Sequence, residues 1–167
     1  MGQHVGINFV EKYGEELKAF VFEAVQHGYG SEDIAGDENT SDGSSTINYE
    51  NGNWRFQDIY YGGEPYSGQS TVFYKGVACW NMTYYGKVLP MVEDKNYVYD
   101  CLMPALMAAS PNFPFRGPSV FIAENGLRYA NIGHGNITQF YGQESIKDQN
   151  DEWLFETHYR GGVVNLR

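Results

Sequence analysis

The chain has 167 residues, of which 42% are hydrophobic and 19% are charged, and its formal net charge is −10. This length and composition fit one globular domain whose core is large enough to fold without a disulfide or a metal ion. The acidic excess, without a lysine or arginine cluster, opposes direct nucleic-acid binding, and no apolar run approaches the roughly 20 residues that a membrane span requires.

An amphipathic helix is predicted over residues 8–27, where apolar residues recur at spacings of three and four. Asn8 with Glu11 three residues later forms a capping-box pattern, and Gly28 follows as a left-handed stop. The next segment, residues 31–46, carries five acidic residues and no basic residue among serines, glycines and threonines. We expect this segment to be a solvated acidic loop.

Two β-hairpins follow the acidic segment. The first is predicted to turn at residues 51–52, which are Asn-Gly, and the second at residues 75–76, which are Lys-Gly. Alternation along the second predicted strand aligns Trp54, Phe56, Asp58 and Tyr60 on one face, and alternation along the fourth aligns Ala78, Trp80, Met82 and Tyr84.

A second helix is predicted over residues 94–110, although Pro104 is expected to kink it or to end its first part. Three prolines make residues 111–118 a stiff connector. Cys79 and Cys101 form no CxxC pair and are expected to be inert, small apolar side chains.

The remaining residues repeat the strand region at an offset of about 74 residues. Residues 50–52, Glu-Asn-Gly, recur as residues 124–126, and residues 66–69 correspond to residues 140–143. Because these matches occur in one order and at nearly one offset, the sequence indicates an internal duplication.

A duplicated unit of one helix and four strands predicts an α+β domain with the element order α-ββββ-α-ββββ. The repeats would cover about residues 8–90 and 94–167 of a single domain that spans residues 1–167. We expect a curved antiparallel sheet with helices packed on one face and with pseudo-twofold symmetry, because each half would bury its aromatic face against the other.

The spacing of glycines and aromatic residues carries a family resemblance. The pattern is Trp54, Asp58, Tyr60, Gly62-Gly63-Glu64, Tyr66, Gly68, Tyr74, Gly76, Trp80, Met82, Tyr84 and Gly86. It resembles the bacterial domain of unknown function 5680 family over most of the chain. The resemblance implies no activity. Members of that family often follow a helix-turn-helix DNA-binding module, which implies a sensing or oligomerising partner of a transcription regulator, yet the first 30 residues of this chain leave no room for such a module.

Aromatic rings and carboxylates on the predicted sheet form a candidate ligand-binding site. Rings offer flat apolar walls, and an acid beside them would hold a cation, so the expected partner is a small aromatic or cationic ligand. The candidate residues are Trp54, Asp58, Tyr60, Glu64, Trp80, Tyr84 and Tyr159. Two other interpretations stay open: core packing of the tryptophans, and hydrogen bonding of either acid to the backbone of the glycine bend.

Three functions follow from these patterns. The leading hypothesis is a non-catalytic module that binds or senses a small ligand. The second is an interaction or oligomerisation module that acts as a homodimer or with a regulator protein through strand edges or a tyrosine-rich surface. The third is an enzyme that uses Glu156 and His158, which share one strand face, but no nucleophile accompanies them and we assign no catalytic residue.

No metal site or cofactor is expected, because the four histidines show no metal-ligand spacing. Two isolated cysteines and the lack of a secretory segment favour a cytoplasmic location.

Overall fold

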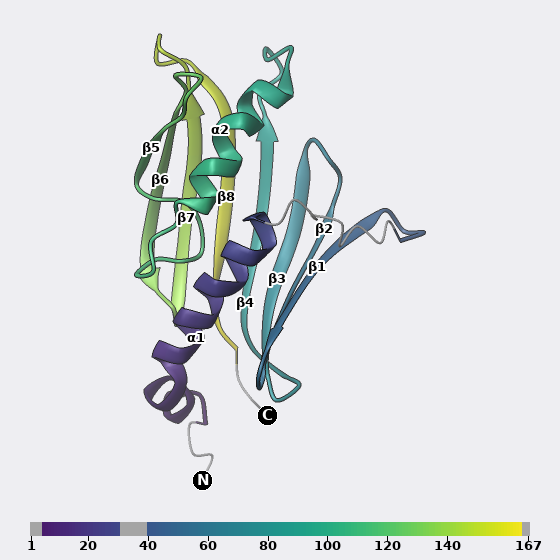
Figure 1. Ribbon diagram of the computed structural model, residues 1–167, viewed down its shortest axis with the longest axis vertical. Coiled ribbons are helices and arrows are strands. Elements are labelled where there is room, and N and C mark those ends of the chain that lie inside the picture. The colour runs from purple at the N-terminus through teal and green to yellow at the C-terminus, as the bar shows by residue number, and fades with distance from the viewer. Residues whose placement is uncertain (1–4, 31–39, 165–167) are drawn as a thin grey trace.

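The computed structural model describes residues 5–30 and 40–164, which form two helices and eight strands (Figure 1). The elements are α1 (Val5–Gly30), β1 (Ser44–Asn51), β2 (Trp54–Tyr61), β3 (Tyr66–Tyr74), β4 (Val77–Val88), α2 (Lys95–Met107), β5 (Val120–Ile122), β6 (Arg128–Asn136), β7 (Gln139–Lys147) and β8 (Trp153–Val163). This is the predicted element order. Most of the acidic segment, residues 31–39, lies outside the described residues, and β1 begins at Ser44, within the segment expected to be a loop.

All eight strands form one antiparallel sheet in the order β1-β2-β3-β4-β8-β7-β6-β5. The α+β class and the curved antiparallel sheet are therefore confirmed (Figure 1). Strands β4 and β8 meet at the centre, where Tyr84 lies directly opposite Tyr159. Strands β1–β3 lie on one side of this central pair and β5–β7 on the other, so β1 and β5 are the two edges.

Helix α1 buries the apolar stripe that the sequence predicts, with Leu17, Val21 and Ala24 at most 1% exposed. The helix is longer than predicted, because it begins at Val5, before the expected cap Asn8, and continues through Gly28 to Gly30. This glycine is buried, and a Cβ there would lie 3.4 Å from the side chain of Ile47 on β1. Gly28 therefore lies inside the helix beside β1 and does not end the helix.

Helix α2 begins after Asp94, whose side chain accepts a hydrogen bond of 3.0 Å from the N–H of Asn96. Pro104 lies inside the helix, which ends at Met107 and is therefore shorter than predicted. Its buried side chains are Val98, Cys101, Leu102, Ala105 and Leu106.

The interior consists of two core clusters that both cross the centre of the sheet. The first core cluster contains buried side chains of α1 and β2–β4 together with Phe115, Phe140 and Tyr159. The second contains buried side chains of α2 and β6–β8 together with Val88, Ala123 and Leu127. Each half of the strand order thus contributes residues to the core of the other half.

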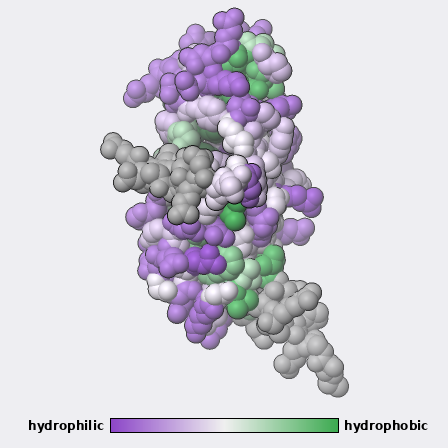
Figure 2. All heavy atoms as spheres, turned by 90° about the vertical axis from the view of Figure 1, so that its right-hand side faces the viewer, coloured by the Kyte–Doolittle hydropathy of each residue, from purple (hydrophilic) through white to green (hydrophobic). Residues whose placement is uncertain are grey.

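Both helices lie in front of the sheet in Figure 1, and we call the opposite side of the sheet the helix-free face. Figure 2 looks onto the side of the molecule that carries β1, where hydrophilic side chains predominate. Cys79 is buried in the same cluster as Trp80, because a shift of the β3–β4 register at this point inserts it as an extra residue. Neither helix has the length and apolarity needed to cross a bilayer within the described residues.

Candidate functional site

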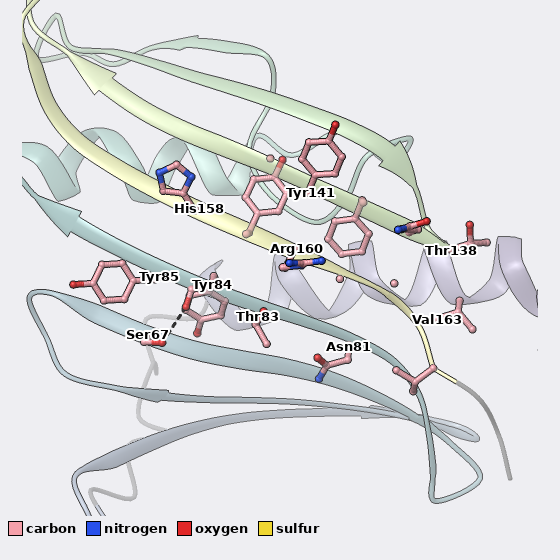
Figure 3. A pocket seen from close by; sticks show the side chains of 17 residues that line it. Ser67, Asn81, Thr83, Tyr84, Tyr85, Thr138, Tyr141, His158, Arg160 and Val163 are labelled. Carbon is pink, nitrogen blue, oxygen red and sulfur yellow. Dashed lines mark hydrogen bonds between the residues drawn. The ribbon is translucent and has the colours of Figure 1, made fainter.

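A shallow hollow of about 1020 Å³ lies on the helix-free face, across the central strands. Strands β3, β4, β8 and β7 supply its floor, so it covers the junction of the two halves of the sheet. Figure 3 looks onto this face with the helices behind the strands. The side chains that matter for its chemistry are Ser67, Thr83, Tyr85, Tyr141, His158 and Arg160.

Arg160 occupies the middle of this hollow, because it lies opposite Tyr141 on β7 and opposite Thr83 on β4. His158, two residues earlier on β8, lies opposite Tyr85. Both tyrosines are well exposed, at 50% for Tyr85 and 60% for Tyr141. The hollow thus combines a guanidinium and an imidazole with two accessible phenol rings.

No carboxylate of the described residues neutralises the guanidinium of Arg160. Across residues 5–30 and 40–164, the side chain of Arg160 forms no ion pair or hydrogen bond, and the nearest acid on its strand, Glu156, pairs with Lys87 at 3.1 Å. Tyr141 is held by the ring of His134, which stacks on it with 5.1 Å between ring centroids. The arrangement therefore leaves the guanidinium open to a ligand while one flanking ring is held in place.

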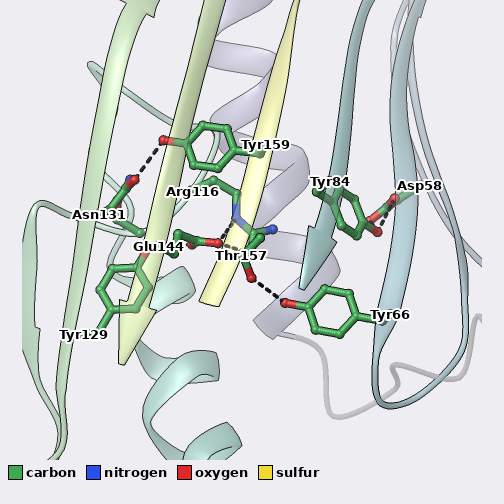
Figure 4. A network of polar contacts seen from close by, with 10 residues as sticks. Asp58, Tyr66, Tyr84, Arg116, Tyr129, Asn131, Glu144, Thr157 and Tyr159 are labelled. Atoms are coloured by element: carbon green, nitrogen blue, oxygen red, sulfur yellow. Dashed lines mark hydrogen bonds and ion pairs between the residues drawn. The ribbon is translucent and has the colours of Figure 1, made fainter. Parts of the chain in front are cut away.

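A network of buried polar side chains lies beneath the hollow, on the helix-covered face of the same strands (Figure 4). We call it the buried polar network, and its members are Asp58, Tyr66, Tyr84, Arg116, Tyr129, Asn131, Glu144, Thr157 and Tyr159. Residues of β4 and β8 alternate between the two sites, so the buried network fixes the strands that display the hollow.

The predicted site residue Asp58 belongs to this network and is only 2% exposed. The hydroxyl of Tyr84 donates to both of its carboxylate oxygens, at 2.8 and 3.0 Å. Burial raises the pKa of Asp58 to about 6, because the cost of desolvating the carboxylate exceeds the effects of the Tyr84 hydrogen bond and of the Arg116 charge.

An ion pair between Arg116 and Glu144 lies in the same network, with Nη2 and Oε2 2.7 Å apart. The two side chains are 2% and 0% exposed, and the hydroxyl of Tyr129 donates to the second carboxylate oxygen at 2.5 Å. Sequence reasoning missed this pair, although Glu144 alternates with Phe140 and Ile146 on a strand face that must be buried. A carboxylate at such a position requires a partner, and Arg116 in the proline-rich connector provides it.

The remaining predicted residues make other contacts. Glu64 accepts hydrogen bonds from the N–H of Val88 at 2.6 Å and from the hydroxyl of Tyr99 at 2.7 Å, so it joins the glycine bend to β4 and α2. Trp54 packs against the aromatic rings of α1, and Tyr60 packs against the first core cluster.

Trp80 is stacked in the interior, with its ring centroid 5.7 Å from that of Phe115 and 5.5 Å from that of Phe140. Its side chain is 1% exposed, which agrees with core packing, one of the interpretations that the sequence left open. The structure therefore brings Asp58, Tyr84 and Tyr159 into one network and leaves the two tryptophans in separate packing contacts.

The described residues offer little for nucleophilic or metal chemistry. Burial raises the pKa of Cys79 to about 12 and that of Cys101 to about 11, so both thiols stay protonated at neutral pH. In the part of the chain that the structure describes, no three histidine, cysteine or acidic side chains are grouped to hold a metal ion.

Comparison with known proteins gives a family but no activity. Neither the curated proteins nor the solved structures include a significant match to the chain. Residues 58–164, which run from β2 through β8, match the family described as Domain of unknown function (DUF5680). The match covers well over half of the sequence, and the chain therefore belongs to the domain of unknown function 5680 family.

Proposed function

We propose that this protein is a non-catalytic module that binds a small, planar, negatively charged ligand in the hollow of the helix-free face. One observation carries the proposal: Arg160 lies beside the accessible ring of Tyr141 in a hollow and has no ionic partner among the described residues. A guanidinium binds a carboxylate through two parallel hydrogen bonds, and phenol rings provide faces for stacking.

The net charge of −10 opposes an anion at long range, so the attraction has to come from the local guanidinium of Arg160. The chain has 21 acidic and 11 basic residues, so acidic partners are plentiful. In such a protein an arginine without a carboxylate partner is available to an external anion. The buried polar network beneath the hollow supports the floor, which limits the ordering cost of binding.

A cationic ligand at Asp58 and Glu64 is the competing form of the proposal. Such a ligand would have to replace the hydroxyl of Tyr84 on the first acid and the hydroxyl of Tyr99 on the second. Because both carboxylates already accept hydrogen bonds inside the protein, the exposed hollow is the better-supported site.

The proposal includes an internal duplication, with repeats of about residues 8–90 and 94–167. Equivalent contacts in the two halves support it: Tyr84 donates to Asp58, and Tyr159 donates to Asn131. A ligand bound over the central strands would contact both repeats, which would allow the module to sense the ligand and signal to a regulator protein in the cytoplasm.

Ligand titrations followed by ¹H–¹⁵N spectra of the purified protein test the proposal. The probes are benzoate and 1-naphthoate, their neutral counterpart benzamide, and the cation benzamidine. We expect the carboxylates to shift the amide signals of β8 and β7 and to raise the melting temperature, since binding to the native state is stabilising. Benzamide should bind more weakly because it lacks the charge.

Variants separate the two forms of the proposal. Arg160→Gln should abolish carboxylate binding, whereas Arg128→Gln, at an exposed arginine that pairs with Asp151, is the matched control and should retain it. If benzamidine binds instead and Asp58→Asn with Glu64→Gln removes that binding, the cationic form is correct. Carboxylate binding that survives Arg160→Gln unchanged, or the absence of any carboxylate binding, would refute the proposed site.

A further inference from the structure

The edge strand β5 exposes two large apolar side chains. Val120 is 60% exposed and Ile122 is 62% exposed, while Phe121 between them packs against the second core cluster. The strand lies at the left-hand edge of the sheet in Figure 1, beside α2. Exposed apolar side chains on an edge strand invite pairing with another chain.

The backbone of β5 is also available. The carbonyl of Ser119 accepts from the N–H of Asn131, and the N–H of Ala123 donates to the carbonyl of Leu127. Because alternate residues of an antiparallel strand point their polar groups to opposite sides, the N–H and C=O groups of residues 120 and 122 point away from β6. The open edge therefore presents two donors and two acceptors.

The other edge of the sheet has a different character. Strand β1 is eight residues long and presents no large exposed apolar side chain, and its exposed positions include Asn48 and Glu50. Charged and polar side chains protect an edge strand against pairing. This protection is absent at Val120 and Ile122, so the two edges differ in their capacity for strand addition.

A hollow of about 370 Å³ opens between β5 and α2, lined by Asp100 and Pro104 of the helix and by residues 121–125. The side chains of Asp100 and Glu124 are exposed and, among the residues that the structure describes, form no ion pair. The hollow thus has an apolar wall and two uncompensated carboxylates.

We propose that β5 docks an extended segment of a partner protein by strand addition, and that this segment carries a basic residue between two apolar residues. Side chains of an added strand alternate between the two faces of the sheet. The apolar pair would contact Val120 and Ile122 on the helix-free face, and the basic residue between them would reach the carboxylates of Asp100 and Glu124.

Charge argues for a different protein as the occupant and against a second copy of this chain. Antiparallel pairing of β5 with its own copy would bring Asp100 and Glu124 of both copies to one interface. Like charges at an interface oppose association, and the net charge of −10 adds to this repulsion. A basic segment gains attraction from the same groups.

Peptide binding measured by fluorescence anisotropy tests the proposal on the full chain. The probe is a labelled, capped peptide of sequence Gly-Thr-Val-Lys-Val-Thr-Gly. The control, Gly-Thr-Lys-Val-Lys-Thr-Gly, carries more positive charge but has its alternation shifted by one residue. We expect the control to bind at least about tenfold more weakly, because its lysines would face Val120 and Ile122.

Variants of β5 locate the site. Ile122→Lys should weaken binding of the probe by about tenfold or more, and Val77→Lys, at a 47%-exposed apolar residue of β4, should leave it unchanged. Asp100→Asn combined with Glu124→Gln should weaken the lysine peptide but not a version with norleucine in place of lysine. A probe N-methylated on alternate backbone amides should not bind, which tests strand addition without altering the protein.

Two results would overturn the proposal. Equal binding of the two peptides, or of the probe to wild type and Ile122→Lys, would show that β5 does not direct recognition. A concentration-dependent dimer that Ile122→Lys converts to a monomer would assign the edge to a second copy of the chain.

Discussion

Tyr84 and Tyr159 lie opposite each other across the β4–β8 pair, and each hydroxyl donates to a polar side chain of an outer strand on its own side. The acceptor is Asp58 for Tyr84 and Asn131 for Tyr159, both at 2.8 Å. The two contacts have the same geometry, but only one acceptor is a carboxylic acid. Comparing them separates the effect of buried charge from that of hydrogen bonding.

Removal of the two hydroxyls should have unequal effects. Tyr84→Phe leaves a carboxyl group that is 2% exposed without its main donor, and Tyr159→Phe leaves a neutral amide oxygen. We expect the first change to lower the free energy of unfolding by about 2 to 3 kcal/mol and the second by about 1 kcal/mol. Urea denaturation at pH 7 measures both, and an equal loss would contradict a special cost for the acid.

The stability of the protein should depend on pH through Asp58. Its pKa of about 6 in the folded state exceeds the ordinary value of 3.8, so the folded state binds more protons between these values. The stabilisation that protonated Asp58 gives the folded state is fully present below pH 3.8 and is lost as the pH rises to about 6. The shift corresponds to a contribution on the order of 3 kcal/mol.

Asp58→Asn isolates this effect from the other titrating groups. The difference in unfolding free energy between wild type and variant should change between pH 4 and pH 6, the range set by the two pKa values, and stay constant above it. The variant should gain relative stability as the pH rises. A flat difference across this range would mean that the folded-state pKa of Asp58 is not raised.

Removing only one partner of the ion pair between Arg116 and Glu144 should strongly lower the free energy of unfolding. Arg116→Met leaves a carboxylate that is fully buried, and we expect a loss of about 3 to 5 kcal/mol. Adding Glu144→Gln should restore part of that loss, because it removes the unpaired charge and keeps an acceptor for the hydroxyl of Tyr129. A double-mutant cycle measured by urea denaturation tests this expectation. It would be contradicted if the loss in the double variant equalled the sum of the losses in the two single variants.

Two glycines beneath the central tyrosines should not tolerate a side chain. A Cβ at Gly68 would overlap the hydroxyl of Tyr84, and one at Gly142 would overlap that of Tyr159. Each alanine substitution should therefore cost about 1 to 3 kcal/mol. Gly63 is the matched control, because a Cβ there has no neighbour within 4 Å, and Gly63→Ala should stay within about 0.5 kcal/mol of wild type in thermal unfolding.

The sequence was a good guide to the elements, because their patterns are local. Three-and-four spacing identified α1, and the Asn-Gly and Lys-Gly turns identified the hairpins. The ends of elements were less accurate. The sequence predicts a helix stop at Gly28, but the helix continues through this glycine, which lies beside β1, to Gly30.

The site was harder to predict because strand alternation defines two faces without saying which one a ligand uses. The prediction selected the apolar face of β2 and β4, where Asp58 and Tyr84 are in fact buried. Arg160 belongs to the other face, and its neighbours there, Thr83 and Tyr141, follow from the strand order, which among the described residues places no carboxylate beside it. No local pattern encodes that neighbourhood.

The position of β8 has a consequence for biosynthesis. It is the last of the eight described strands in sequence order, yet it lies in the middle of the sheet and pairs with β4 over residues 80–88. While the ribosome is still translating β8, β4 has an unpaired edge, and a nascent chain with such an edge is prone to wrong pairing. Completion of the sheet must therefore wait until residues 153–163 have been translated, so the central β4–β8 pairing forms later than the hairpins of the first four strands.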